Sequence, residues 1–457
     1  MYRDLYKKFC TPDQRRKFKQ TFRSGKQGYL RMKKSCYGTK QAAKNWYEKL
    51  DQILIGLGYN ATPCDPCLYI RWSGDDFVLI ACYVDDIFGT GTSTRMFQEL
   101  VDGLNQQLEV VNLGEIQHIL GMIVTHQSNG DILLNNEIYI ENMLMNFDGE
   151  SIDTKEIPAP GESILSKEDC IKKEDYDVNV QERYRSLIGS LLYAAICWRP
   201  DIMYRVTQLA RFNGVAGPIH VKAGNYLLKY LRKTSDWGLL FKGGSGQRKI
   251  QPIFITSCDA SYAGNEYRIS VSGWTRQMVD LIDWENRIIV NGNMDILTNY
   301  NCTSYSSHRQ KGVVATSSTE AEYVAGADTV KMIEHSDQKT NALGFPSVPG
   351  SIVFVDNTSI MKIADEWKVN DRTRHIDIRF HHIRIAVIKK RVLLRKVDGK
   401  FNTSDMMTKS LHYPLHERHR SKLMIGKISD TEKHFGRTRM SRYVPERDGI
   451  SKRTKST

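Results

Sequence analysis

Two adjacent aspartates close an apolar run in the first quarter of the chain. Asp85 and Asp86 follow residues 77–84, which are almost entirely aliphatic or aromatic. Neighbouring carboxylates at the end of such a run repel each other and lose hydration. A tight turn between two antiparallel strands accommodates the pair, because one side chain can point across the sheet while the other stays at the turn. The pattern predicts a β-hairpin with its turn at residues 83–86.

The aspartate pair allows two interpretations. A divalent cation would offset the repulsion, since Mg²⁺ is a hard ion that takes carboxylate oxygens together with substrate phosphates. A surface turn with two solvated side chains would need no ion. The β-branched and aromatic residues on both sides, with Tyr83 directly before the pair, favour the metal site.

Charge is distributed unevenly along the 457 residues, a length that suggests two to four domains. The net charge is +13, and the Lys and Arg residues gather in the first fifty residues and after residue 412. Basic ends around a mildly acidic centre indicate contact with a polyanion, such as a nucleic acid. Solvated tails are the alternative, above all for residues 425–457.

Several classes of protein are excluded by the composition. No apolar run approaches 18 residues, and the first residues lack the apolar segment of a signal peptide, so no membrane segment is expected. The nine cysteines are odd in number and scattered, which is typical of reduced thiols inside a cell. Cys64 and Cys67 form a single CxxC pair, and no second pair has the spacing of a zinc site.

The segment before the hairpin combines basic and aromatic residues. A short strand is expected to run into Gly38, and Ala42, Trp46 and Leu50 then recur at helical spacing. The lysines around these aromatics suit contacts with phosphates and bases; they are Lys33, Lys34, Lys40 and Lys44.

Periodicity and turn residues predict the next elements. In chain order, we expect a strand at residues 68–72 and a hairpin turn at 73–75, then a helix at 93–108, a turn, helix and strand over 113–124, a strand at 132–134, a helix at 138–147, a linker at 148–180 and three amphipathic helices across 184–231.

Four carboxylates in the second half of the chain lie where sites form in α/β sheets. Asp259 and Asp356 each end an apolar strand, and Glu322 and Asp405 each lie in the first turn of a helix. Sites in such sheets form beyond the carboxyl ends of the strands. With two divalent ions about 4 Å apart, four converging acids would form a phosphodiester hydrolase. Singly, each acid is also an ordinary strand-end or helix N-terminal residue.

The start of the Glu322 helix is marked twice. Ser317 with Glu320, and Thr319 with Glu322, both fit the capping box in which a hydroxyl and a carboxylate three residues later satisfy the first backbone amides. The sequence leaves open which pair caps the helix.

The chain resembles the C-terminal part of a copia-type (Pseudoviridae-like) LTR retrotransposon Pol polyprotein, in which reverse transcriptase is followed by RNase H. The matching stretches, in family order, are residues 32–46, 65–69, 83–86, 113–115, 184–193, 199–202, 259–264, 317–323, 356–357, 372–379 and 405–409.

The resemblance implies a polymerase site on the hairpin. Asp85 and Asp86 would be the palm carboxylates that hold two Mg²⁺ ions at the primer end and the incoming nucleotide. The implied nucleotide- and template-binding residues are Gly38, Lys40, Gln41 and Tyr83, and the implied primer grip is the segment around residues 120–122.

A second implied site is the RNase H centre. Asp259, Glu322, Asp356 and Asp405 would be its catalytic residues and would bind two Mg²⁺ or Mn²⁺ ions. Such a nuclease cuts the RNA strand of an RNA–DNA hybrid, which it recognises by its 2′-hydroxyls and minor groove.

The implied fold is a partial α+β polymerase palm, with an antiparallel hairpin and helices, and a helical thumb/connection, followed by an α/β RNase H-like domain. The implied domains are a basic N-terminal segment (1–28), a partial reverse transcriptase palm (29–150), a linker and helical thumb/connection (151–246), the RNase H-like domain (247–412) and a basic C-terminal tail (413–457).

The chain departs from the family pattern in several places. Within the helix motif, Cys36 and Thr39 stand where the family has apolar residues, and Ala43 stands where it usually has Pro. Family polymerases have a third carboxylate on a strand before the Gly38 helix, whereas Asp4 and Asp13 are the only acids before residue 29. We therefore expect a chain truncated upstream of the palm hairpin. Residues 278–300 read as extra or drifted sequence, and residues 302–307 replace the family's third RNase H strand.

The expected function is that of an RNA-directed DNA polymerase with RNase H. An RNase H-type nuclease alone and a catalytically inactive nucleic-acid-binding remnant are the alternatives. The implied partners are an RNA template, an RNA–DNA hybrid, dNTPs and the rest of the Pol/Gag particle, without a membrane. The implied location is a cytoplasmic particle, and it could include a nuclear phase.

Overall fold

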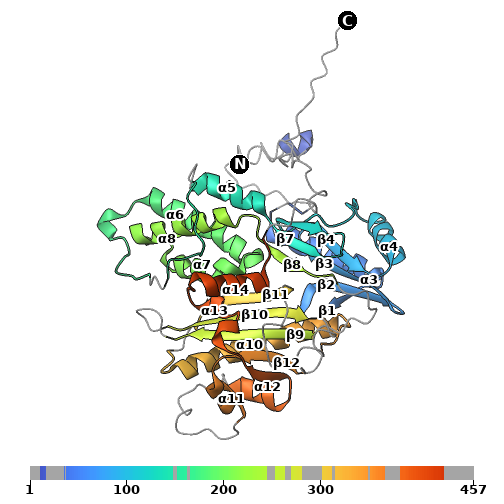
Figure 1. Cartoon of the computed structure of the whole chain (residues 1–457). Coiled ribbons are helices and arrows are strands. Elements are labelled where there is room, and N and C mark those ends of the chain that lie inside the picture. Colours follow the sequence, from blue (N-terminus) through green and yellow to red (C-terminus); the bar gives the residue numbers. More distant parts are fainter. Residues whose placement is uncertain are drawn as a thin grey trace. The chain divides into compact units, whose positions relative to one another are not determined.

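The computed structural model describes the chain in eleven stretches (Figure 1). They are residues 11–16, 35–36, 38–147, 152–161, 165–243, 253–262, 269–279, 301–310, 314–347, 350–365 and 381–426. Two compact units result, Met1–Asn112 and Leu113–Thr457. No helix in the described stretches combines the length and apolar character that a membrane crossing requires.

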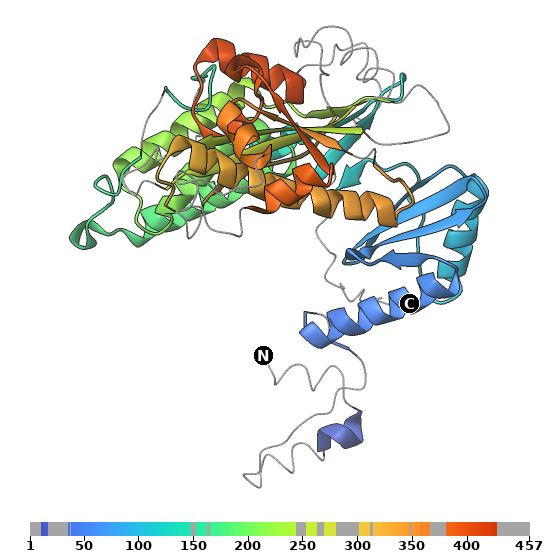
Figure 2. The same cartoon turned by 90° about the horizontal axis from the view of Figure 1, so that it is seen from below.

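The main part of unit 1 is an antiparallel sheet with helices α3 and α4, which Figure 2 shows in blue. Its elements are α3 (Lys40–Gly56), β1 (Asn60–Thr62), β2 (Asp65–Ser73), β3 (Asp76–Tyr83), β4 (Asp86–Gly91) and α4 (Thr94–Asn105), with sheet order β1-β2-β3-β4. Val78 and Ile80 alternate with more exposed residues on β3 and join a core that includes Leu54 of α3 and Leu104 of α4. The predicted hairpins and the helix near residues 93–108 are confirmed, and this unit has the α+β character that was expected.

Unit 2 begins with a second antiparallel sheet. Its strands are β5 (His118–Ile119), β6 (Met122–His126), β7 (Ile132–Asn135) and, from much later in the chain, β8 (Leu239–Phe241). The helix predicted within residues 113–124 is wrong. Leu120 (φ 49°) and Gly121 (φ 76°) both adopt the left-handed conformation of a two-residue hairpin turn, so the apolar residues on either side pair as strands.

Two side chains that are distant from the turn in sequence hold it. The Tyr193 hydroxyl donates a hydrogen bond to the carbonyl of Leu120, and Nδ2 of Asn136 donates one to the carbonyl of Gly121, both at 2.5 Å. These two bonds fix a turn whose first residue, a leucine, has an unfavourable positive φ.

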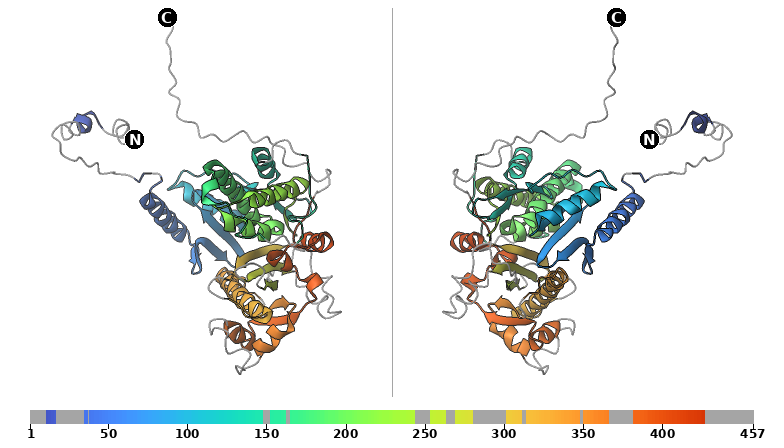
Figure 3. Two further views of the ribbon diagram at one scale, coloured as in Figure 1. Left: turned by 90° about the vertical axis from the view of Figure 1, so that its left-hand side faces the viewer. Right: turned by 90° about the vertical axis from the view of Figure 1, so that its right-hand side faces the viewer.

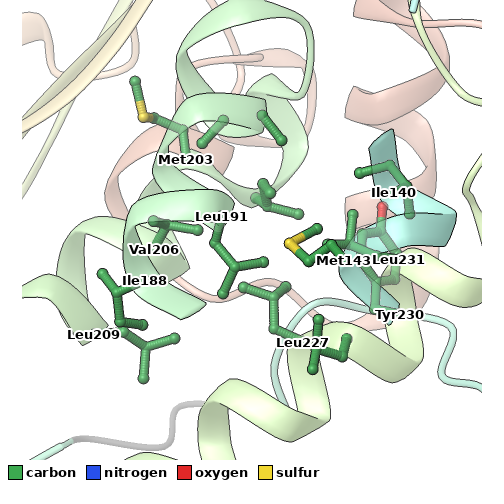
Figure 4. Packing of buried hydrophobic residues seen from close by; sticks show 14 of the residues in the cluster. Ile140, Met143, Ile188, Leu191, Met203, Val206, Leu209, Leu227, Tyr230 and Leu231 are labelled. Atoms are coloured by element: carbon green, nitrogen blue, oxygen red, sulfur yellow. The ribbon is translucent and has the colours of Figure 1, made fainter. Parts of the chain in front are cut away.

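A helical cluster forms the largest hydrophobic core among the described residues (Figure 4). It contains α5 (Glu137–Phe147), α6 (Val178–Cys197), η2 (Pro200–Ile202), α7 (Met203–Leu209), η3 (Ala210–Phe212) and α8 (Pro218–Lys233). Leu191, Val206 and Leu227, from three different helices, are fully buried against one another, as their helical spacing predicted. Part of the predicted linker lies against this cluster, because Asp153 forms an ion pair with Lys229 of α8 at 2.8 Å.

The last part of unit 2 is a mixed five-stranded sheet. Its strands are β9 (Ile253–Ser261), β10 (Val271–Val279), β11 (Cys302–Arg309), β12 (Ser351–Val355) and β13 (Val392–Lys396), in the order β11-β10-β9-β12-β13. β9, β12 and β13 run parallel, whereas β10 is antiparallel to both of its neighbours. The divergent residues 302–307 therefore do form the third strand, and most of the drifted segment, residues 280–300, lies outside the described residues.

The two faces of this sheet are covered by different helices (Figures 1 and 3). Cys258 and Val353 face the core beneath α10 (Ser318–Ala342), α11 (Thr358–Asp365) and α12 (His382–Ile388). Because side chains alternate along a strand, Asp259 and its cross-strand neighbour Gly273 face the other way. A Cβ atom at Gly273 would lie 2.5 Å from Cβ of Met407, so glycine is needed for α13 (Asp405–Thr408) to approach the sheet here.

The C-terminal helix α14 (Tyr413–Leu423) buries two histidines, His416 and His419. Burial lowers the pKa of His416 to about 4, although the charge of Asp201 opposes this shift. Burial and the nearby charge of Lys422 lower the pKa of His419 to about 3. Both rings are therefore neutral in the folded chain at pH 5, whereas they are largely protonated in the unfolded chain.

We expect these histidines to make the chain acid-sensitive. Between pH 6.5 and 5 the unfolded state binds more protons than the folded state at these two sites, so acidification reduces the free energy of unfolding. Each ring contributes up to about 2 kcal/mol of this loss by pH 5. Chemical denaturation at pH 6.5 and at pH 5 should show that the free energy of unfolding falls less in His419→Leu than in the unaltered chain. His118→Leu, at an exposed position, should leave the loss unchanged.

Candidate active site

Three carboxylates meet at one edge of the five-stranded sheet. Asp259 lies near the end of β9, and Asp356 directly follows β12, its parallel neighbour. Glu322 comes from α10. One carboxylate oxygen from each of the three lies within 4.8 Å of the other two. The structure thus brings together three of the four acids that strand ends and helix starts singled out.

The cap of α10 leaves Glu322 available for this site. Ser317 is the N-cap residue, and its side chain accepts a hydrogen bond from the Glu320 backbone amide at 3.1 Å. The Glu320 carboxylate accepts bonds from the backbone amide and the hydroxyl of Thr316. Of the two capping pairs that fit the sequence, the earlier one is therefore used, and Glu322 is buried beside Asp259 instead.

Asp405 joins the site through a lysine. Nζ of Lys409 lies 3.0 Å from Oδ2 of Asp405 and 3.5 Å from Oδ2 of Asp259. The Thr408 hydroxyl donates a hydrogen bond to the same oxygen of Asp259. Sequence reasoning did not single out Thr408 or Lys409 as site residues. The i, i+4 spacing of Asp405 and Lys409 was the available signal, because residues four apart face each other on a helix.

The surroundings of this site oppose ionisation of its carboxyl groups and raise the pKa of three of them. Burial, with the charges of Asp259 and Asp356, raises the pKa of Glu322 to about 10. Burial and the charge of Asp259 raise the pKa of Asp405 to about 8, against the opposing effect of Lys409. Burial also raises the pKa of Asp356. A multivalent cation would reverse this balance, since an opposite charge favours the ionised form of each carboxyl group.

The donor atoms fit a hard divalent ion. Oε2 of Glu322 and Oδ1 of Asp405 are buried and have no hydrogen-bond partner among the described residues. Buried polar atoms are normally satisfied, so these two oxygens have unused capacity as ligands. Carboxylate oxygens alone, without histidine or cysteine, suit Mg²⁺ or Mn²⁺.

The hairpin of unit 1 carries the other aspartate pair. Tyr83 pairs with Asp86 across the turn, as predicted, and Val84 has a φ of 54°, which is unfavourable for a β-branched residue. Nε1 of Trp46, on α3, donates a hydrogen bond to the carbonyl of Val84 at 2.7 Å and so holds the turn. Asp85 and Asp86 are exposed, and among the described residues no third acid, His or Cys completes a ligand group with them.

The residues expected near template and nucleotide lie at the start of α3 and on the hairpin. Gly38 (φ 84°) precedes the helix, where the Thr39 side chain caps the Ala42 amide. Lys40 and Gln41 follow in the first turn and are exposed. These two, with Gly38 and the half-exposed Tyr83, leave polar and aromatic groups open to solvent on unit 1.

Comparison with known proteins shows which family of proteins the sequence resembles. A family model described as reverse transcriptase (RNA-dependent DNA polymerase) matches residues 18–160. The Pol polyprotein of transposon TNT 1-94 from Nicotiana tabacum is 32% identical over 382 residues, covering 83% of this chain and 27% of that protein. The Pol polyprotein of transposon RE1 from Arabidopsis thaliana is 27% identical over 401 residues, covering 87% of this chain and 25% of that protein.

The chain thus spans about a quarter of the length of these two polyproteins. A solved structure of the foamy viral protease-reverse transcriptase in complex with an RNA/DNA hybrid aligns with a TM-score of 0.41 at 11% identity, over 80% of this chain and 39% of that one. From the two polyproteins and the family model, the resemblance to copia-type Pol polyproteins of LTR retrotransposons is confirmed over most of the chain, with a reverse transcriptase match at residues 18–160.

Proposed function

We propose that this chain carries the reverse transcriptase and RNase H activities of a copia-type retrotransposon. The hairpin with Asp85 and Asp86 belongs to the polymerase, and the acidic site of unit 2 belongs to the nuclease. The observation that supports the nuclease most directly is the meeting of Asp259, Glu322 and Asp356 within 4.8 Å. The match of residues 18–160 to the reverse transcriptase family supports the polymerase.

In this proposal the domains have the bounds expected from the sequence. Residues 29–150 form the palm, 151–246 the linker and thumb/connection, and 247–412 the RNase H-like domain. Lysines and arginines of the basic segments at 1–28 and 413–457, other than those that α14 buries, contact the phosphates of the RNA template or the hybrid. The chain works on dNTPs and nucleic acid in a cytoplasmic particle with other Pol and Gag products.

The nuclease site prepares its ligands before an ion binds. Thr408 orients Asp259 by donating a hydrogen bond to one oxygen, which leaves the other oxygen for a ligand role. Burial keeps Glu322 protonated, so ion binding releases a proton from that carboxyl group. When bound, two Mg²⁺ ions would activate the attacking water and neutralise charge on the scissile phosphate. Asp259, Glu322, Asp356 and Asp405 would hold them.

Cleavage of a labelled RNA–DNA hybrid tests the nuclease. The purified chain with Mg²⁺ should release short RNA products, and EDTA should stop the reaction. Asp259→Asn should lower the rate by at least about 100-fold, because it removes a charge from the centre of the ligand group. Asp328→Asn, on the same domain but outside the site, should cleave at the unaltered rate. Equal cleavage by Asp259→Asn and the unaltered chain would rule out this site.

Primer extension tests the polymerase separately. We expect the chain to extend a DNA primer on an RNA template with Mg²⁺ and dNTPs, and Asp85→Asn to abolish the extension while hybrid cleavage continues. Extension that survives in Asp85→Asn would show that the hairpin is not the polymerase centre. Cleavage without extension in the unaltered chain would leave only the nuclease.

A further inference from the structure

Lys409 occupies a special position among the carboxylates of unit 2. Its ammonium lies between Asp405 and Asp259, at 3.0 and 3.5 Å. Both partners are almost fully buried, whereas the lysine side chain itself is 39% exposed. The ammonium thus contacts two buried carboxyl groups, while part of the lysine side chain is open to solvent.

The ammonium contacts the same carboxylates that would hold a divalent ion on this side of the site. Asp259 is shared, since it also belongs to the three-carboxylate group with Glu322 and Asp356. Oδ1 of Asp405 is buried and has no partner in the described part of the chain, so the lysine satisfies only part of that carboxylate. Like charges at such separations repel each other, and a divalent ion doubles the repulsion that a unit charge would exert on the ammonium.

We propose that Lys409 is a resident counter-ion that occupies the second cation position, between Asp259 and Asp405, until a metal ion displaces it. This inference rests on the proposed nuclease function. The first ion binds at the Asp259, Glu322 and Asp356 group without disturbing the lysine. The second ion binds only when the ammonium leaves Asp405 and turns to solvent, so the lysine weakens the second binding step.

Counting bound Mn²⁺ ions tests this inference. The full chain is used with Asp85→Asn and Asp86→Asn, so that unit 1 does not contribute, and free Mn²⁺ is measured by electron paramagnetic resonance. We expect one tight site and one weaker site. Lys409→Met should tighten the weaker site by at least about tenfold, because the competing charge is gone. Lys409→Arg, which keeps the charge, should leave that site weak.

Thermal unfolding in EDTA provides a second readout on the same variants. Lys409→Met should lower the Tm without metal, since the carboxylates lose their only bonded cation among the described residues. Added Mn²⁺ should raise the Tm of Lys409→Met by more than it raises the Tm of the unaltered chain. Lys331→Met, which removes an exposed ion pair with Asp328 of α10, is the matched control and should change neither quantity.

Amine labelling of the unaltered chain decides the matter if Lys409→Met does not fold. The rate at which an amine-reactive reagent modifies Lys409, followed by mass spectrometry, should rise severalfold on adding Mn²⁺, while the rate at Lys331 stays constant. The counter-ion role alone would be overturned if Mn²⁺ bound without changing the labelling rate of Lys409. It would also be overturned if the weaker Mn²⁺ site had the same affinity in Lys409→Met and in the unaltered chain. A chain that binds no more Mn²⁺ than its Asp259→Asn variant would overturn the nuclease function as well.

Discussion

Replacing Glu322 with glutamine should stabilise the metal-free chain while abolishing hybrid cleavage. The folded chain raises the pKa of Glu322 from 4.5 to about 10. Between these values the folded state holds a proton that the unfolded state releases, so the metal-free stability falls as the pH rises. At pH 8, which is 3.5 units above the unfolded value of 4.5, this effect reaches up to about 5 kcal/mol. Glutamine has a similar shape and does not ionise, so the variant does not lose stability as the pH rises.

Chemical denaturation with EDTA measures this gain. The free energy of unfolding of Glu322→Gln should exceed that of the unaltered chain at pH 8, and the difference should shrink at pH 6. Added Mg²⁺ should reduce the difference, because an ion that binds the folded state stabilises only the chain with the complete site. Hybrid cleavage should fall by at least about 100-fold, since one ligand charge is missing.

Glu320→Gln is the matched control, two residues earlier on the same helix. Glu320 is also buried, but its carboxylate accepts the Thr316 hydrogen bonds near the start of α10. The same substitution there should destabilise the chain with or without metal, by about 1 kcal/mol. A loss of stability in Glu322→Gln with EDTA, comparable to that of Glu320→Gln, would show that Glu322 is a structural residue.

The parts of this chain that depend on local pattern were predictable. The turn at residues 83–86 followed from an apolar run that ends in two acids, and the structure places it between β3 and β4. Asp259 and Asp356 could be grouped because parallel strands bring their carboxyl ends to one edge. Glu322 could be added because a capping box marked the start of its helix, although only the structure shows which box is used.

Where a segment fits both a helical and a strand pattern, the sequence did not show which of the two it forms. Residues 113–124 contain apolar residues at spacings that suit a helix or a strand, and a helix was predicted there. The left-handed conformation of Leu120 depends on hydrogen bonds from Asn136 and Tyr193, which are distant in sequence. Such tertiary contacts override local propensity and cannot be read from one sequence.

Contacts between distant segments were also beyond the sequence. Lys409 was part of a quoted motif, but its position between Asp405 and Asp259 depends on the close approach of α13 to β10 at Gly273. The expected division at residue 150 stays a prediction. The structure adds that β8, at residues 239–241, pairs with β7, at residues 132–135, so these two stretches share one sheet in unit 2.

The second large effect is expected at a buried ion pair in the helical cluster. Arg199 and Asp201, both 0% exposed, form two hydrogen bonds of 2.9 and 2.7 Å. The Arg199 guanidinium also donates to the Thr234 carbonyl and hydroxyl. The Tyr230 hydroxyl donates to Asp201 at 2.6 Å and accepts a bond from Arg420 of α14 at 3.0 Å. One network therefore joins η2, α8 and α14.

The charge of Arg199 is what keeps Asp201 ionised in this interior. Burial alone would raise the pKa of Asp201, but the charge and hydrogen bonds of Arg199 outweigh burial and lower it. The pKa of Arg199 is correspondingly raised, since Asp201 outweighs the effect of burial there. Each residue is thus stable in its charged form only because the other is present.

Asp201→Asn should therefore reduce the free energy of unfolding by about 3–5 kcal/mol, because it leaves a buried guanidinium without its counter-charge. Glu48→Gln, which breaks the exposed pair with Lys44 at 3.5 Å, should cost less than about 1 kcal/mol. The double variant Arg199→Met with Asp201→Leu should lose less than Asp201→Asn alone, since no uncompensated charge remains. A double variant that loses as much as the sum of its two single variants would show that packing, and not the buried charge, sets the cost.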